Sequence, residues 1–175
     1  MKKIILAAIA VLGFSFANAQ EGKFKVGAHA GLPIGGSDFY SVNIGVDASY
    51  MWKVADKFTL GAITGYSTYL GKTNTVNFMG VSVSYKSNNA SFIPIAATGQ
   101  YSLSDKFFVG ADLGYAISVG EGTGGFLYQP KFGYQNEKIE LYMGYKDISY
   151  TTTTDHGFSK ANGISSLNLG FKYKF

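Results

Sequence analysis

The chain has 175 residues, with 15 lysines, no arginine and 11 acidic residues, which gives a formal net charge of +4 at pH 7. It contains no cysteine, which excludes a disulfide-stapled fold and a thiol catalyst. The lysines do not gather into the basic cluster that a nucleic-acid partner requires. Aromatic residues make up 16% of the chain, and 23 glycines stand against three prolines. This composition favours β-structure.

The first residues have the layout of a secretory signal peptide. Lys2 and Lys3 precede the apolar run "IILAAIAVLGFSFA", and the small residues of Ala17–Ala19 provide a cleavage site. A membrane-spanning helix needs about 20 apolar residues, whereas this run has 14. We therefore expect a signal peptide over residues 1–19 and one domain over residues 20–175.

After this segment, apolar and polar residues alternate with a period of two, and no stretch shows helical periodicity. The alternation predicts eight strands. They are expected at residues 23–33, 41–52, 57–70, 91–103, 106–118, 124–136, 138–150 and 164–175.

Short and long connections between these strands alternate along the chain. The short ones are "VADK", "LSDK" and "NEK", and the long ones include "GKTNTVNFMGVSVSYKSNNA" and "TTTTDHGFSKANG". Transmembrane barrels keep short turns at the periplasmic end and longer loops outside. The pattern predicts an all-β, eight-stranded, antiparallel up-and-down transmembrane barrel with both termini at the periplasmic end. The alternating "VSVSYKS" is interpreted as an extension of the hairpin between the third and fourth strands, beyond the membrane.

The two faces of each expected strand differ, and one of them is apolar. A soluble barrel would turn the apolar face inward, and a dozen aromatic rings would overfill so small a lumen. We therefore expect the apolar face to meet lipid, with aromatic residues at the membrane interfaces. Those expected at the interface of the short-turn end are Tyr50, Trp52, Phe58, Tyr101, Phe107, Tyr134, Tyr173 and Phe175.

The opposite face is polar and rich in glycine, and its charges should pair inside a narrow lumen. Lys131 and Glu140 flank the short "NEK" turn and are expected to form an ion pair, while Asp47 and Asp112 could take Lys25 or Lys131. The network either fills the lumen as a passive structure or forms a gated polar pathway or proton relay. Its expected members are Lys25, His29, Asp47, Asp112, Lys131, Glu140, Lys146 and Lys172.

Two prolines interrupt the expected strands. Pro94 and Pro130 each lack the N–H that a strand ladder uses. We expect a β-bulge at each, or a strand boundary that lies beyond Pro94.

The last strand, with Leu169, Phe171, Tyr173 and Phe175 on one face, resembles the C-terminal assembly signal of bacterial outer-membrane barrels. Residues 20–175 resemble the small eight-stranded OmpX/OmpA-type barrels, and Ile93–Ile117 is similar to the outer membrane protein beta-barrel domain group. The resemblance implies the outer membrane of a Gram-negative bacterium, with membrane lipid and the insertion machinery as partners and a monomeric state. It marks an architecture and not a chemistry.

No constellation for catalysis stands out, and we expect no enzyme, no cofactor and no metal site. His29 lies on the lumen face, and Asp155, His156 and Ser159 fall in a Thr-rich loop without the geometry of a hydrolase. The expected role is structural, or an interaction at the cell surface through the hairpin of residues 71–90. The alternatives are a narrow channel for small solutes and a lipid-modifying enzyme.

Overall fold

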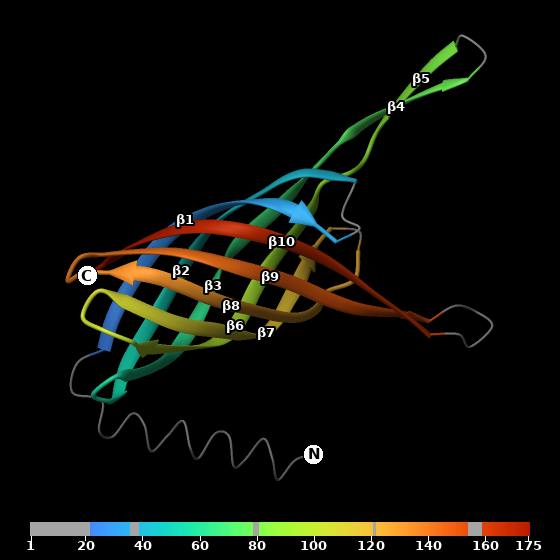
Figure 1. Ribbon diagram of the computed structural model, residues 1–175. Helices are drawn as coiled ribbons and strands as arrows, with labels where there is room; N and C mark the ends of the chain where they lie inside the picture. Colours follow the sequence, from blue (N-terminus) through green and yellow to red (C-terminus); the bar gives the residue numbers. More distant parts are fainter. Residues whose placement is uncertain (1–21, 36–38, 79–80, 121, 154–158) are drawn as a thin grey trace.

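The computed structural model describes residues 22–35, 39–78, 81–120, 122–153 and 159–175. Eight of its strands form a closed antiparallel barrel in the order β1-β10-β9-β8-β7-β6-β3-β2 (Figure 1). Within the described residues, no helix has the length and apolar character that a membrane crossing needs. The strands of the barrel are β1 (Gly22–Ile34), β2 (Tyr40–Ala55), β3 (Phe58–Gly71), β6 (Ala90–Ser102), β7 (Phe107–Val119), β8 (Gly125–Gln135), β9 (Ile139–Thr153) and β10 (Ser159–Lys174).

The barrel has two different ends. The short connections β2–β3, β6–β7 and β8–β9 lie at one end together with the C-terminus, and we call it the turn end (Figure 1). Local side-chain caps hold these turns: the Ser104 hydroxyl accepts from the backbone N–H of Phe107 at 3.1 Å, and the Asn136 carbonyl accepts from that of Ile139 at 2.8 Å. The longer connections lie at the other end, the hairpin end.

The first and last strands close the barrel. β1 pairs with β10 from Lys25–Lys174 to Ile34–Ser165, and the backbone N–H of Phe175 donates to the carbonyl of Phe24 at 2.9 Å. Closure leaves no free edge in the wall, so that every strand has two neighbours. The predicted eight-stranded antiparallel barrel is therefore confirmed.

A second, two-stranded sheet projects from the hairpin end. It consists of β4 (Thr73–Phe78) and β5 (Val81–Lys86), which pair only with each other. Figure 1 shows this hairpin continuing β3 and β6 past the rim of the barrel. "VSVSYKS" is thus part of a hairpin extension, as predicted, and adds no strand to the wall.

The expected bulges at the prolines are wrong. The pairing of β6 with β7 runs without interruption through Pro94–Ala116, and that of β7 with β8 runs through Ala111–Pro130. On the opposite side of each proline the ladder is interrupted. β3–β6 pairs stop at Thr64–Ile95 and resume at Ser67–Phe92 in the same register. The missing donor is accommodated by omitted ladder bonds on one side, which costs less than shifting a whole strand.

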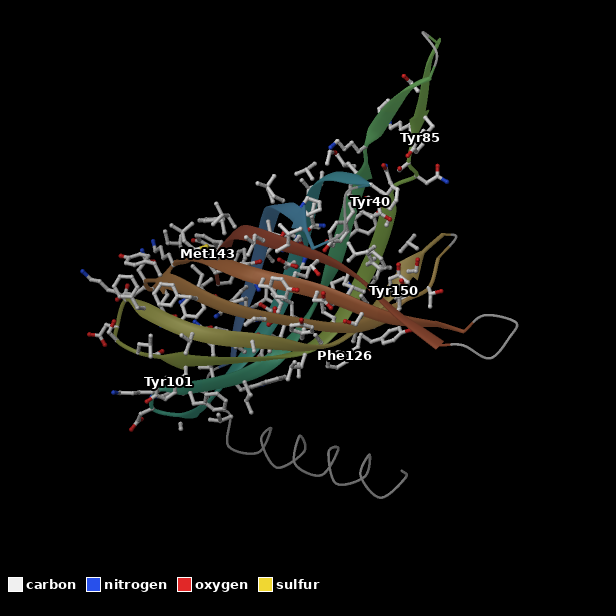
Figure 2. All side chains as sticks on the ribbon, turned by 45° about the vertical axis from the view of Figure 1, so that its right-hand side comes forward. Tyr40, Tyr85, Tyr101, Phe126, Met143 and Tyr150 are labelled. Carbon is white, nitrogen blue, oxygen red and sulfur yellow. The ribbon has the colours of Figure 1, made fainter. Side chains whose placement is uncertain are left out.

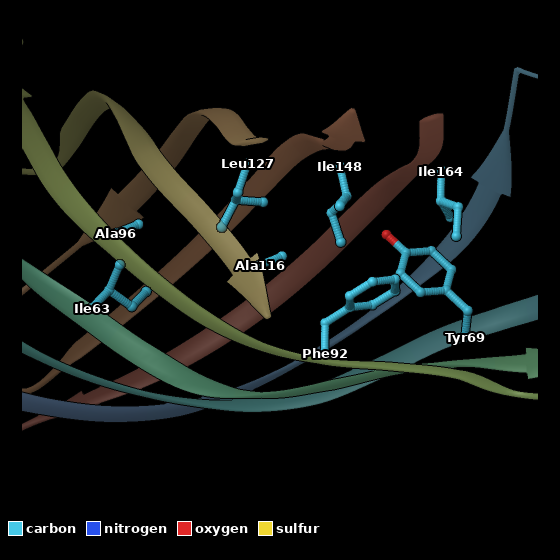
Figure 3. Packing of buried hydrophobic residues seen from close by; sticks show 8 residues of the cluster. All are labelled: Ile63, Tyr69, Phe92, Ala96, Ala116, Leu127, Ile148 and Ile164. Carbon is cyan, nitrogen blue, oxygen red and sulfur yellow. The ribbon is translucent and has the colours of Figure 1, made fainter. Parts of the chain in front are cut away.

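Side chains alternate between the outside and the lumen along each strand. Figure 2 shows Tyr101 near the turn end and Tyr85 on the projecting hairpin, beyond the barrel. Most of the buried apolar residues gather in the lumen toward the hairpin end, and we call this group the apolar cluster (Figure 3). Its members are Ile63, Tyr69, Phe92, Ala96, Ala116, Leu127, Ile148 and Ile164.

Candidate functional site

The outside of the barrel is an apolar wall. Large apolar side chains from every strand of the barrel are exposed on it, and Leu169, near the middle of β10, is 67% exposed. Such a continuous surface far exceeds the few hundred Å² of apolar patch that soluble monomers carry. Others on the wall are Val26, Ile44, Val46, Leu60, Ile95, Val109, Leu113, Phe132, Leu141, Met143 and Phe171.

Aromatic rings gather on this wall at the turn end. The rings of Tyr50 and Trp52 lie 5.1 Å apart edge to face, and those of Tyr173 and Phe175 lie 5.0 Å apart in the same manner. Phe175 also contacts Phe24 at 6.0 Å across the closing seam of the barrel. Rings with an apolar body and a polar tip suit the level of lipid headgroups.

An exposed apolar wall around a polar lumen is the reverse of a soluble barrel, and it defines a transmembrane barrel. Replacing Leu169 by lysine should therefore lower the free energy of unfolding by about 2–4 kcal/mol in lipid vesicles. Unfolding in guanidinium followed by Trp52 fluorescence measures this change. As a control, Leu103→Lys makes the same substitution at an exposed site in a turn, and its cost should stay within about 1 kcal/mol. Equal losses would contradict the lipid-facing position of Leu169.

In the lumen near the turn end, Glu140 lies between two lysines. Lys25 forms an ion pair with it and also donates to the Gln100 side chain at 3.0 Å, and the Lys174 ammonium lies 3.7 Å from the same carboxylate. The predicted Lys131–Glu140 pair is wrong. The strand register places Glu140 opposite Gln135 and Lys131 opposite Gly144, which separates the two along the barrel axis.

Lys131 instead pairs with Asp112 on the neighbouring strand, at 2.7 Å. Its ammonium also lies over the ring of Tyr142, 5.5 Å from the centroid, and that of Lys172 lies 5.6 Å from the same ring. Tyr142 is thus central to the network, although sequence reasoning did not single it out. On β9 it stands an even number of residues from Glu140 and Lys146, so all three side chains face the lumen. This alternation was the sequence signal that could have identified Tyr142.

His29, Asp47 and Ser67 form a line that has the order of a hydrolase triad. His29 Nδ1 lies 3.0 Å from Asp47 Oδ2, and its Nε2 lies 3.3 Å from Ser67 Oγ. Lys146 Nζ, however, lies closer to Nε2, at 2.8 Å, and an ammonium can only donate. Nε2 must therefore accept from Lys146 while Nδ1–H donates to Asp47.

This arrangement does not activate the serine. The Nε2 lone pair that would take the Ser67 proton is already shared with Lys146, and the Asn43 amide donates to Ser67 Oγ at 2.9 Å. Ser67 is 2% exposed, so an acyl carbonyl cannot reach it. The line serves to satisfy buried polar groups.

The lumen toward the hairpin end is occupied by the apolar cluster. Tyr69 is 0% and Phe92 3% exposed, and their rings meet edge to face at 6.2 Å. Figure 3 shows the two rings side by side. The expectation of a polar, glycine-rich lumen is therefore incomplete. Ile148 lies two residues after Lys146 on β9, so its side chain also faces the lumen. The sequence prediction assigned polar residues and glycines to the lumen and therefore left Ile148 out.

A polar group on the outside wall was also missed. Asp147 is buried although it shares the outward phase of Met143 and Tyr145. Its carboxylate accepts from the Ser165 hydroxyl at 2.6 Å, from the Ser149 hydroxyl, and from the Tyr145 hydroxyl at 3.4 Å. These donors satisfy the charge at the hairpin end of the wall.

Some sequence predictions lie outside the described residues. These include the signal peptide over residues 1–19 and the pair Asp155 and His156. Ser159 begins β10.

A scan against protein-family models finds no match, and neither does a search of curated proteins. Solved structures do match. A de novo designed transmembrane β-barrel shares 13% identity at a TM-score of 0.53, with 89% of this chain and 98% of that chain covered. Two structures of Ail, the attachment invasion locus protein of Yersinia pestis, each match at a TM-score of 0.51. The structure in complex with the heparin analogue sucrose octasulfate shares 12% identity with this chain, and the structure in a phospholipid bilayer nanodisc shares 10%. Each match covers 89% of this chain and 100% of that chain. The chain has the fold of the small OmpX/OmpA-type barrels.

Proposed function

We propose that the chain is a monomeric outer-membrane protein that acts at the cell surface through the β4–β5 hairpin. The observation that carries this proposal is a two-stranded sheet that projects beyond the barrel and pairs with no other strand there. Each of its strands has one edge without a described neighbour, which is a template for strand addition by a partner. Export through the signal peptide and assembly by the insertion machinery through the terminal strand belong to the same proposal.

The pairing within the hairpin also supports a partner. Its register pairs Val76 with Val83 and Phe78 with Val81, so that apolar residues are paired with apolar residues. It also pairs Thr75 with Ser84. Apolar residue pairs in a sheet outside the membrane favour a protein partner that covers them.

The lumen contributes to the proposal because it offers no wide path. The apolar cluster occupies it toward the hairpin end, and buried ion pairs line it toward the turn end. We infer that the barrel is a passive anchor and not an enzyme or a channel. Ail bears the name attachment invasion locus protein, and a surface role of the same general kind suits this fold.

A deletion tests the proposal. Removing residues 73–86 should leave the barrel folded, because this hairpin pairs with no strand of the wall. Bacteria that display the shortened chain should lose their attachment to protein-coated surfaces. Heat-modifiable gel mobility verifies folding in each strain.

A matched pair of variants locates the contact. Val76→Ser with Val83→Ser should reduce attachment at least about fivefold, because it replaces an apolar cross-strand pair of the hairpin with a polar one. Thr75→Ala with Ser84→Ala alters the neighbouring cross-strand pair, which has no large apolar residue, and should leave attachment unchanged. Attachment that survives both the deletion and the Val76→Ser/Val83→Ser variant would refute the surface role.

A further inference from the structure

A lysine-rich pocket of about 160 Å³ occupies the mouth of the lumen at the turn end. Its lining includes Lys23 and Lys25 of β1, Lys53 of β2, Lys57 of the β2–β3 turn and Lys174 of β10. Segments far apart in the sequence thus bring five lysines to the lining of one cavity. Ammonium groups gathered in this way repel one another unless an anion lies between them.

The carboxylates nearby do not balance this charge. Glu140 is shared by Lys25 and Lys174 behind the pocket, and Asp56 lies 3.3 Å from Lys53 at the rim. The Asp56 side chain is fully exposed, and a pair so open to water contributes little. Five lysines against these two carboxylates leave a formal excess of three positive charges.

The floor of the pocket is held in place by hydrogen bonds to the neutral side chains of Gln100 and Gln135. The Gln135 carbonyl accepts from the Gln100 amide at 3.0 Å and from Lys174 at 3.2 Å, while the Gln135 amide donates to Ser102 at 3.1 Å. Lys25 donates to the Gln100 carbonyl. The two innermost lysines are therefore oriented before any ligand arrives, which lowers the entropy cost of binding.

We propose that this pocket binds an oxyanion of the phosphate class. Lysine binds phosphate as a compact point charge, and the cavity has room for about five water molecules at about 30 Å³ each, which suits a small anion. The strand alternation places the side chains of Lys25, Lys53 and Lys174 on the lumen side of the barrel. The pocket therefore lies at the lumen mouth and not on the lipid-facing wall. The ligand is therefore a soluble phosphate and not a lipid headgroup. This site goes beyond the proposed surface role and does not depend on it.

Two methionines provide a direct readout. Met51 lines the pocket, whereas Met143 lies on the lipid-facing wall. The folded chain, labelled with ¹³C at the methionine methyls and placed in nanodiscs of zwitterionic lipid, is titrated with inorganic phosphate in a buffer without other oxyanions. The Met51 resonance should shift and saturate, and the Met143 resonance should stay in place.

Exposed lysines at the same end of the barrel supply matched variants. Lys53→Gln with Lys57→Gln should weaken phosphate binding about tenfold, because it removes two of the five ammonium groups. Lys106→Gln with Lys138→Gln removes the same charge from the other two turns, outside the pocket, and should change the affinity less than about twofold. All four side chains are exposed, so the fold is not at risk.

Nanodiscs with added phosphatidylglycerol distinguish the sources. If Met51 shifts with the anionic lipid and not with phosphate, the ligand is a headgroup and our assignment of a soluble anion is overturned. The site itself is refuted if phosphate fails to shift Met51 saturably, or if both pairs of variants weaken binding to the same extent.

Discussion

Replacing Glu140 by glutamine should lower the free energy of unfolding by about 3–5 kcal/mol, the cost of removing one partner from a buried ion pair. The Glu140 side chain is only 5% exposed and that of Lys25 7% exposed, and Lys174 also depends on this carboxylate. The substitution leaves two ammonium groups in the lumen without their shared counter-charge. Guanidinium unfolding of the barrel in lipid vesicles, followed by the fluorescence of Trp52, measures the loss.

Two controls separate charge from shape. Glu137→Gln makes the same change at an exposed position of the neighbouring turn, and it should stay within about 0.5 kcal/mol of the wild type. A double variant, Lys25→Met with Glu140→Leu, removes both charges and should recover much of the stability, because an apolar pair of similar volume avoids the desolvation cost. A double variant as unstable as Glu140→Gln alone would show that packing, and not the lost counter-charge, dominates.

The strand alternation shows which features of such a barrel can be predicted from its sequence. A period of two assigns each residue to the wall or the lumen, and this was enough to predict that Leu169 faces outward and that Lys172 faces inward. Strand number and the two ends followed from the alternation of short and long connections. These features depend on local geometry alone.

The partners across the lumen could not be predicted in the same way. Lys25 and Glu140 are 115 residues apart and meet because strand tilt and register bring them to one height. Proximity across the "NEK" turn suggested Lys131 as the partner of Glu140, and the stagger of β8 against β9 excludes it. A register is a property of the whole closed sheet, so a single hairpin does not determine it.

Opening the apolar cluster should convert the closed barrel into a conducting one. Tyr69 and Phe92 pack against each other from neighbouring strands at the hairpin end of the lumen, and both are almost fully buried. Replacing both by serine removes two rings and introduces hydroxyls, so water should enter a space from which the wild-type rings exclude it. In planar bilayers we expect steady current steps for this variant and none for the wild type.

The part of the lumen between the apolar cluster and the turn end determines which ions should pass. Five lysines lie along it against three carboxylates, and His29 is neutral because its Nε2 accepts a hydrogen bond from Lys146. The formal excess of two positive charges should make the opened barrel selective for anions. The reversal potential in a salt gradient measures this selectivity directly.

A control on the lipid-facing side makes the test specific. Tyr66→Ser with Phe126→Ser removes a tyrosine and a phenylalanine that are exposed on the outside of the barrel, and this variant should remain silent in the same bilayers.

Loss of the two buried rings costs about 3–5 kcal/mol for each, so heat-modifiable mobility must first establish that the Tyr69→Ser/Phe92→Ser variant is folded. A folded Tyr69→Ser/Phe92→Ser barrel that passes no current would mean that the polar network closes the lumen by itself. Current through the wild type would mean that the cluster is not a seal, and the narrow-channel alternative would then replace the passive anchor.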